Sequence, residues 1–330
     1  FAFLIAVTLI IVGRGTIDQT FFLNLLFYII FTPVISTTLS KVIFMSENKM
    51  LVEDSLQRIH SILDIKPLSN NESKVEIKDN SIELKDVKFK YENSKNNAID
   101  GISIKIKPNE TIALVGPSGS GKSTLANLIS RFYDIDSGKI LIGNVNVKDI
   151  EKKELMNTIS FVFQNSKLLK TSIYENVKMA KPEATKVEVL HALHLAQCDD
   201  IVQKLPNGID TVIGTKGVYL SGGEEQRINI ARIMLKDSKV VILDEATAFA
   251  DPENEIQVQK AFEELSKNKT VIMIAHRLST IKNVDKIYVL NNGKIEEEGN
   301  HEELLNKNGL YKEMWDNYQT SISWKVGENV

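Results

Sequence analysis

The chain has 330 residues, long enough for two domains, and its 43% hydrophobic and 25% charged residues are ordinary for a globular protein. A formal net charge of -3 argues against a broad nucleic-acid-binding surface, so no nucleic acid is expected as a partner. The single cysteine, Cys198, excludes an internal disulfide framework, and the scattered histidines form no motif for a transition-metal site.

The N-terminal segment is far more apolar than the rest of the chain. Residues 1–12 carry no charge, but a helix of that length rises only about 18 Å, too little to cross a bilayer. We expect a transmembrane helix cut at its start, and not a signal peptide, because a basic leader and a small-residue cleavage site are missing. Residues 19–40 are also uncharged and would rise about 33 Å as a helix, which is a full span. A buried hairpin of soluble helices is the alternative, which the all-round apolarity of residues 20–31 disfavours.

The apolar span continues into a more polar helical segment. Polar side chains from Thr32 to Ser40 are expected to face other helices or a water-filled path, because lipid cannot satisfy them. From Lys41 to about Leu63 the helical pattern acquires a polar face, which predicts a stalk running from the membrane into water. Residues 65–80 are rich in Asn, Ser, Lys and Glu without an apolar period, so we place the domain linker there.

The region after the linker has the pattern of a mixed sheet. Continuously apolar runs are typical of parallel strands buried on both faces, and they occur at 111–115, 240–243 and 271–275. Shorter or alternating runs predict further strands at 82–89, 102–106, 140–142 and 145–147, and a terminal hairpin at 289–295. Residues 165–235 read as mainly helical. The pattern predicts an α/β fold with additional antiparallel strands and a helical region.

The segment GPSGSGKS at 116–123 fits the phosphate-binding pattern G-x-x-x-x-G-K-[ST] between a predicted strand and a predicted helix. Glycines let backbone N–H groups approach a polyphosphate, and the helix N-terminus adds its positive dipole end. Lys122 would reach the β- and γ-phosphates of ATP, Ser123 would ligate Mg²⁺, and Thr124 would support it. A glycine-rich turn that binds nothing is the alternative, disfavoured by the flanking strand and helix. The predicted phosphate loop comprises Gly116, Ser118, Gly119, Gly121, Lys122, Ser123 and Thr124.

Two further stretches narrow the chemistry. The apolar strand at 240–243 ends in two carboxylates and is expected to lie beside the phosphate loop, where Asp244 could hold Mg²⁺ and Glu245 could polarise the attacking water. The alternative interpretation is that these two carboxylates are solvent-exposed loop residues without a catalytic role. The second stretch, LSGGEEQR at 220–227, places Ser221 as the cap of a helix, and its Ser-Gly-Gly start is a second candidate anion cradle.

These motifs, in this order, resemble the ATP-binding cassette (ABC) family, in particular subunits that fuse a membrane domain to a nucleotide-binding domain with the exporter-type fold. The resemblance covers nearly the whole chain. It implies a P-loop α/β domain with antiparallel β and helical subdomains, preceded by the last helices of an all-α membrane domain. It also implies that about four membrane helices precede Phe1.

The resemblance assigns roles to individual residues. Ser221, Gly222 and Gly223 would contact ATP held by a second subunit, in a head-to-tail dimer that sandwiches two nucleotides. The remaining matches are Tyr91 against adenine, Gln164 near Mg²⁺ and the membrane domain, Asp251 in the loop between subunits, and His276 beside the γ-phosphate. Taken singly, a tyrosine after a strand is usually surface packing and a histidine ending an apolar strand is usually a core residue.

Three positions depart from the family pattern. Glu224 stands where glutamine is usual, which should matter little because Ser221 and the glycines make the phosphate contacts. Residues 248–251 read Ala-Phe-Ala-Asp in place of Ser-Ala-Leu-Asp, and residues 213–217 lack the usual acidic side chain. Both lie where subunits communicate, and both look similar to a subgroup associated with uptake of iron-siderophore complexes.

The expected domains are the end of the membrane domain at 1–64, the linker at 65–80, the nucleotide-binding domain at 81–320 and a tail at 321–330. The expected function is ATP-driven export of a lipid, peptide or drug-like molecule from a multi-pass protein of the cell membrane with its nucleotide-binding domain in the cytoplasm. The bilayer and a second subunit, identical or different, are the expected partners. Uptake of a metal chelate is the alternative. A soluble ABC ATPase would lack the apolar segments, and a small-molecule kinase would have no use for LSGG.

Overall fold

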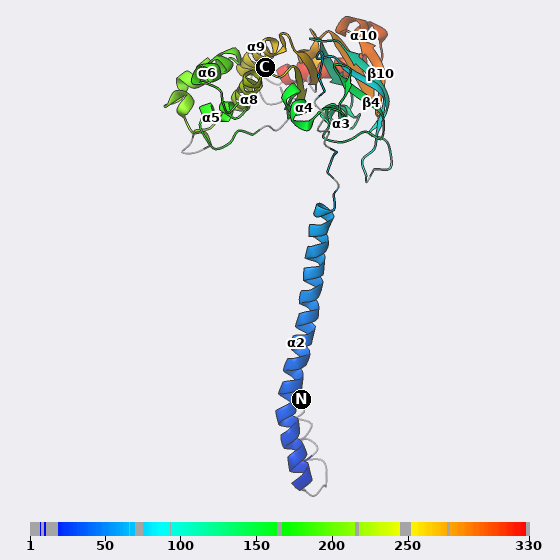
Figure 1. Ribbon diagram of the computed structural model, residues 1–330, viewed down its shortest axis with the longest axis vertical. Coiled ribbons are helices and arrows are strands. Elements are labelled where there is room, and N and C mark those ends of the chain that lie inside the picture. The colour runs from blue at the N-terminus through cyan, green and yellow to red at the C-terminus, as the bar shows by residue number, and fades with distance from the viewer. Residues whose placement is uncertain are drawn as a thin grey trace. The chain divides into compact units, whose positions relative to one another are not determined.

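The computed structural model describes residues 19–65, 67–69, 75–92, 94–163, 167–214, 218–244, 252–275 and 278–327, together with Val7 and Ile10. The chain divides into two compact units, Phe1–Pro67 and Leu68–Val330 (Figure 1). The first unit is dominated by a single helix, and the second contains all the described strands.

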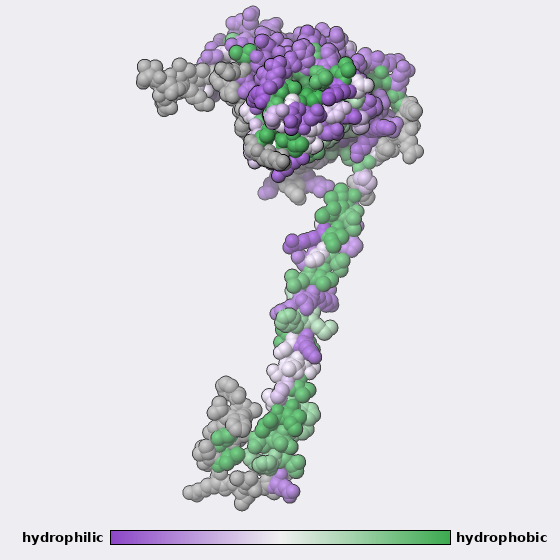
Figure 2. Space-filling view, turned by 90° about the vertical axis from the view of Figure 1, so that its left-hand side faces the viewer, coloured by the Kyte–Doolittle hydropathy of each residue, from purple (hydrophilic) through white to green (hydrophobic). Residues whose placement is uncertain are grey.

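Helix α2 of the first unit runs without a break from Gln19 to Leu63. It is the one helix in the described part of the chain that is long and apolar enough to cross a membrane. None of its residues is buried, and the space-filling view shows a dense hydrophobic surface along its N-terminal part (Figure 2). Such a surface is stable only against lipid or other apolar partners.

Two threonine hydroxyls of α2 are hydrogen-bonded within the helix itself, whereas the sequence suggested that they face other helices or a water-filled path. Thr32 donates to the Tyr28 carbonyl at 2.6 Å, and Thr38 donates to the Val34 carbonyl at 2.7 Å. Threonine hydroxyls in helices commonly bond back to a carbonyl one turn earlier, so these two groups need no partner outside the helix. Pro33 also lies inside this helix and has no N–H to donate to the carbonyl one turn earlier.

The second unit is built on two sheets. The larger sheet has six strands in the order β10-β9-β3-β8-β7-β6, in which only β10 is antiparallel to its neighbour. Its strands are β3 Thr111–Val115, β6 Ile159–Val162, β7 Val240–Asp244, β8 Thr270–Ile274, β9 Lys286–Asn291 and β10 Lys294–Gly299. The antiparallel sheet has the order β2-β1-β4-β5, from β1 Ile82–Phe89, β2 Ile99–Ile106, β4 Ser137–Ile142 and β5 Val145–Asn146.

The parallel strands are buried on both faces, as their unbroken apolar runs predict. In β7, Val240 and Ile242 pack into a core shared with the antiparallel sheet and α3 (Lys122–Ile129), whereas Val241 and Leu243 pack into a second core. The turn at Gly143-Asn144 also forms as predicted, because both residues take positive φ, 55° and 67°, which suits a two-residue hairpin.

Helices cover the sheet and extend beyond it. At one end of the unit α5, α6 and α8 lie together, and β4, β10 and α10 lie at the other (Figure 1). The helices not yet named are α4 Lys152–Thr158, α5 Ile173–Lys178, α6 Lys186–Leu195, α7 Asp199–Lys204, α8 Gly222–Lys236, α9 Pro252–Ser266, α10 His301–Lys307 and α11 Leu310–Gly327, with 3-10 turns at η1 Gly208–Asp210 and η2 Leu278–Ile281. The expected fold class, a P-loop α/β domain with antiparallel and helical regions, is confirmed.

Candidate functional site

The phosphate loop connects β3 to α3, and its three glycines all take positive φ: 146° at Gly116, 79° at Gly119 and 104° at Gly121. A Cβ on Gly116 would lie 2.0 Å from the Leu290 carbonyl oxygen, and one on Gly121 would lie 2.7 Å from that of Ala98. A Cβ on Gly119 would meet nothing within 4 Å. Two of the glycines are therefore required by packing of the loop on the protein itself, and only Gly119 faces open space where a ligand can approach the backbone.

Lys122 begins α3 and turns back into the loop. Its side chain is buried, with the residue only 5% exposed, and its ammonium donates to the carbonyls of Gly116 and Pro117 at 2.9 Å each. Ser118 and Gly119 are exposed on the outer side of the loop. The loop thus holds a cation inside a ring of backbone groups at the N-terminus of a helix, an arrangement that favours binding of a phosphate anion.

Ser123 and Asp244 come together although they are far apart in sequence. Ser123 Oγ donates to Asp244 Oδ1 at 3.4 Å. Strand β8 lies between β3 and β7 in the sheet, so the carboxylate reaches the loop from the next strand but one. A hydroxyl and a carboxylate are hard oxygen donors, and Mg²⁺ in nucleotide sites is held by such side chains together with phosphate oxygens and water. These residues fit a magnesium nucleotide.

Tyr91 forms a hydrogen bond to the helix that follows the phosphate loop. Its hydroxyl lies 3.1 Å from Thr124 Oγ1 in α3, and its ring packs edge-on against Phe89 and Tyr133 with centroids 4.8 and 5.5 Å away. Thr124 therefore contacts the tyrosine predicted to meet the base, an arrangement that the sequence did not indicate. The structure brings Tyr91, the phosphate loop and Asp244 into one site.

Ser221, Gly222 and Gly223 form the start of α8, as predicted. Ser221 Oγ accepts from the Glu224 N–H, and Glu224 in turn accepts from the Ser221 N–H at 2.8 Å, which is a capping box. Burial raises the pKa of Glu224, but the Lys204 ammonium and the Ser221 N–H outweigh it, so this pKa lies below its usual range. Glu224 thus stabilises the helix start as an anion, and the expectation that its replacement of glutamine matters little for phosphate contacts stays a prediction.

Residues that sequence reasoning missed surround this helix start. Arg227 is buried and forms two hydrogen bonds to the Asp200 carboxylate and one to Asn254 in α9. A signal was present, because helical spacing places Arg227 on the same face as the apolar Ile230, Ala231 and Met234. A buried arginine requires an anionic partner. Four predicted site residues, Gln164, Glu245, Asp251 and His276, lie outside the described residues, as do positions 215–217 and 248–250.

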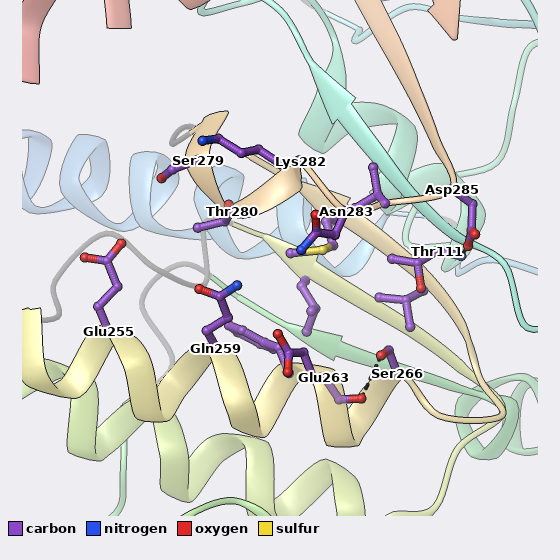
Figure 3. Close-up of a pocket in the computed structure, with 15 residues that line it drawn as sticks. Thr111, Glu255, Gln259, Glu263, Ser266, Ser279, Thr280, Lys282, Asn283 and Asp285 are labelled. Atoms are coloured by element: carbon purple, nitrogen blue, oxygen red, sulfur yellow. Dashed lines mark hydrogen bonds between the residues drawn. The ribbon is translucent and has the colours of Figure 1, made fainter. Parts of the chain in front are cut away.

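A separate cavity of about 150 Å³ lies between α9 and η2 (Figure 3). Glu255, Gln259 and Glu263 of α9 line one side of it, and Thr280 and Lys282 line the other. Among the residues that the structure describes, no predicted site residue lines this cavity. The described residues of the phosphate loop therefore lie outside this cavity.

The phosphate loop after β3, its lysine, and an aspartate at the end of β7 define the class of P-loop nucleotide-binding proteins. Residues 99–248 match the sequence model of the ABC transporter family. The chain therefore contains an ABC transporter domain, and the resemblance inferred from its motifs is confirmed.

Known proteins place the similarity among exporters. An ATP-dependent lipid A-core flippase from Haemophilus influenzae (strain 86-028NP) is 44% identical over 261 residues, covering 78% of this chain and 44% of that protein. ABC transporter B family member 4 from Dictyostelium discoideum is 40% identical over 287 residues, 86% of this chain and 37% of that protein. A solved structure of a bacterial Atm1-family ABC exporter with ATP bound gives a TM-score of 0.73 at 34% identity, covering 79% of this chain and 46% of that one. The chain spans less than half the length of these relatives.

Proposed function

We propose that this chain binds ATP with Mg²⁺ and hydrolyses it to drive transport across a membrane. The observation that carries the proposal is the convergence of the phosphate loop and Asp244, at 3.4 Å from Ser123, in a chain that also contains a membrane-length helix. When bound, Mg²⁺ would neutralise charge on the transferred phosphoryl group, held by Ser123, Asp244 and Gln164. Lys122 would bind the β- and γ-phosphates, and Tyr91 would stack on the adenine.

Hydrolysis is assigned to residues at the ends of β7 and β8. Glu245 follows Asp244 and would orient the attacking water as a general base, and His276 would contact the γ-phosphate. Ser221, Gly222, Gly223 and Asp251 would act on the nucleotide of a second subunit. The active form is then a dimer, because one chain supplies only half of each ATP site.

The transported molecule is proposed from the relatives. One relative is named as a lipid A-core flippase and a similar structure as an exporter, which favours export of a lipid, peptide or drug-like molecule. The chain would sit in the cell membrane as a multi-pass protein, with 1–64 as the end of the membrane domain, 65–80 as linker and 81–320 as the cytoplasmic nucleotide-binding domain. The unusual sequences at 213–217 and 248–251 keep uptake of a metal chelate as the second candidate.

Vesicle transport distinguishes these candidates. The complete subunit with its partner is reconstituted with the nucleotide-binding domains facing outward, and Mg-ATP is added. ATP-dependent accumulation of a lipid or drug-like substrate inside the vesicles supports export, whereas ATP-dependent loss of preloaded ferric siderophore supports uptake. If neither ATP-dependent change is seen with a broad panel of both substrate classes, the proposed transport function is wrong.

A further inference from the structure

A chain of hydrogen bonds connects three helices and ends at the hydroxyl of Ser221. The Asp200 carboxylate in α7 accepts from both terminal nitrogens of Arg227 in α8, at 2.7 and 2.9 Å. Arg227 also donates to Asn254 Oδ1 in α9 at 2.9 Å. Asn254 Nδ2 in turn donates to Ser221 Oγ at 3.4 Å. The two residues in the middle of this chain, Arg227 and Asn254, have no role in the proposed reaction.

The direction of every bond in the chain is fixed by the chemistry of its members. A guanidinium carries only donors, so the amide of Asn254 must turn its oxygen toward Arg227. The NH₂ group of the same amide then faces Ser221, and the serine oxygen must accept. The Glu224 N–H also donates to this oxygen at 3.4 Å. With both acceptor positions of the oxygen engaged, the Ser221 O–H is left to act as a donor.

The direction of these hydrogen bonds is set by Arg227, a buried and charged side chain. The Arg227 side chain is 1% exposed, and it also donates to the Gln197 carbonyl. A buried guanidinium held by a carboxylate cannot reverse its hydrogen bonds, because it has no acceptor and remains protonated. The chain runs outward from this point through the half-buried Asn254 to the exposed Ser221. An exposed serine would otherwise rotate its hydroxyl freely.

We infer that Asn254, oriented by Arg227, is a positioning residue that directs the Ser221 O–H outward as a hydrogen-bond donor to a nucleotide phosphate. The inference rests on the proposed function, in which Ser221 contacts ATP held by the second subunit. A phosphate oxygen only accepts, so a serine whose proton is committed elsewhere would contribute nothing to it. Preorganised donors of this kind act without reorientation as charge develops on the phosphoryl group.

Asn254→Asp tests the polarity directly. The carboxylate keeps the contact to Arg227, so α9 should stay packed, but it offers only acceptors and would take the Ser221 proton for itself. In the full chain reconstituted with its partner, we expect kcat for ATP hydrolysis to fall about tenfold or more. Binding of a fluorescent ATP analogue to the chain's own phosphate loop should change by less than about twofold, since that loop is not altered.

Gln259→Glu is the matched control. It adds the same single negative charge to the same helix at an exposed position and should leave kcat within about twofold of the parent value. Thermal unfolding of each variant shows whether a fall in kcat comes from a less stable fold or from a changed orientation of the Ser221 hydroxyl. A fall in kcat for Asn254→Asp that is matched by Gln259→Glu would overturn the inference, because a general charge effect would then explain it.

A double-mutant cycle with Ser221→Ala completes the test. If Asn254 acts through the Ser221 hydroxyl, Asn254→Asp should have almost no additional effect on kcat in the Ser221→Ala background. Additive losses would mean that Asn254 merely stabilises the packing of α8 and α9, and the inference would be wrong. If Ser221→Ala alone leaves kcat unchanged, the proposed role of Ser221 fails, which is a different result from failure of the positioning role.

Discussion

The phosphate loop uses glycine for two different physical purposes. Gly116 is held against a neighbouring strand, where the Leu290 carbonyl leaves no room for a side chain, whereas Gly119 is open on its outer side. The pattern of glycines in the sequence predicted the loop and its ligand. It could not separate these purposes, because the obstructing atom at Gly116 belongs to a strand more than a hundred positions away in the chain.

This difference predicts that two alanine substitutions in the loop affect different properties, the stability of the fold at Gly116 and the binding of ATP at Gly119. Gly116→Ala should lower the free energy of unfolding by about 3 kcal/mol, because its Cβ would overlap backbone that cannot move. Gly119→Ala should cost only about 1 kcal/mol for the left-handed conformation, but it should weaken ATP binding by about tenfold through the new methyl group at the mouth of the loop. Chemical denaturation and nucleotide titration measure the two effects. Equal stability of the two variants would contradict the assignment.

The proposed chemistry separates binding from hydrolysis at single residues. Lys122→Ala should abolish productive ATP binding, since it removes the cation held inside the loop. Glu245→Gln should retain ATP binding and lower kcat by about a hundredfold or more, because it removes only the carboxylate that orients water. Equilibrium binding and steady-state turnover of both variants check this. Near-parental turnover in Glu245→Gln would remove that residue from its assigned role.

At the scale of elements, the sequence predicted most of the strands but missed β6, and it did not predict where the strands lie in the sheets. Apolar runs correctly indicated buried parallel strands, because a strand covered on both faces needs no polar alternation. The order of the strands depends on crossover connections, and β8 therefore lies between β3 and β7 without any local signal. The contacts of Arg227 were equally hidden, since its partners in α7 and α9 are each 27 residues away.

The contact between α10 and α11 predicts a pH dependence. His301 Nδ1 lies 2.7 Å from the Tyr311 hydroxyl, and the His301 ring also packs on Trp315. Burial, with a further contribution from the Lys282 ammonium, holds the pKa of His301 below its usual range, although Glu302 opposes this. Burial also raises the pKa of Tyr311 to about 12, so its hydroxyl stays protonated and can donate.

The sign of the effect follows from linkage. A histidine whose pKa is lower in the folded state binds protons more readily when unfolded, so stability is lost as the pH falls below the unfolded value of about 6.5. His301→Gln should remove this contribution and flatten the decline in stability between pH 7.5 and pH 5. Urea denaturation of both proteins across this range provides the measurement. Identical pH dependence would show that the His301 charge is not coupled to folding.

At the scale of the whole molecule, the boundary of the nucleotide-binding unit is marked by a specific contact. The Arg131 guanidinium at the end of α3 donates to the Ser69 carbonyl at 2.7 Å and to its hydroxyl at 3.0 Å. The same side chain binds Asp134 and the carbonyls of Val147 and Lys148, and it is only 5% exposed. Ser69, in a segment whose composition predicts only a linker, thus accepts two of the hydrogen bonds of a buried arginine.

Two fragments with different start points test this boundary. A fragment of residues 68–320 should be more stable than one of residues 78–320 by about 1 to 2 kcal/mol, because the shorter one deprives Arg131 of two hydrogen bonds to a charged donor. Substituting Arg131→Lys in both should shrink that difference, since lysine cannot satisfy all these acceptors at once. Equal stability of the two parent fragments would show that the Ser69 contact contributes nothing to folding.

The same fragments also test the shared-site dimer. With Glu245→Gln, both should be monomers without nucleotide and form dimers with Mg-ATP, because in the proposed arrangement each ATP needs the phosphate loop of one chain and Ser221 of another. Light scattering at high protein concentration measures the change. Ser221→Ala is the control, which should weaken the dimer while leaving the phosphate loop intact. If no ATP-dependent dimer forms from either fragment, the second half of each ATP site must come from a different chain, or the shared-site arrangement is wrong.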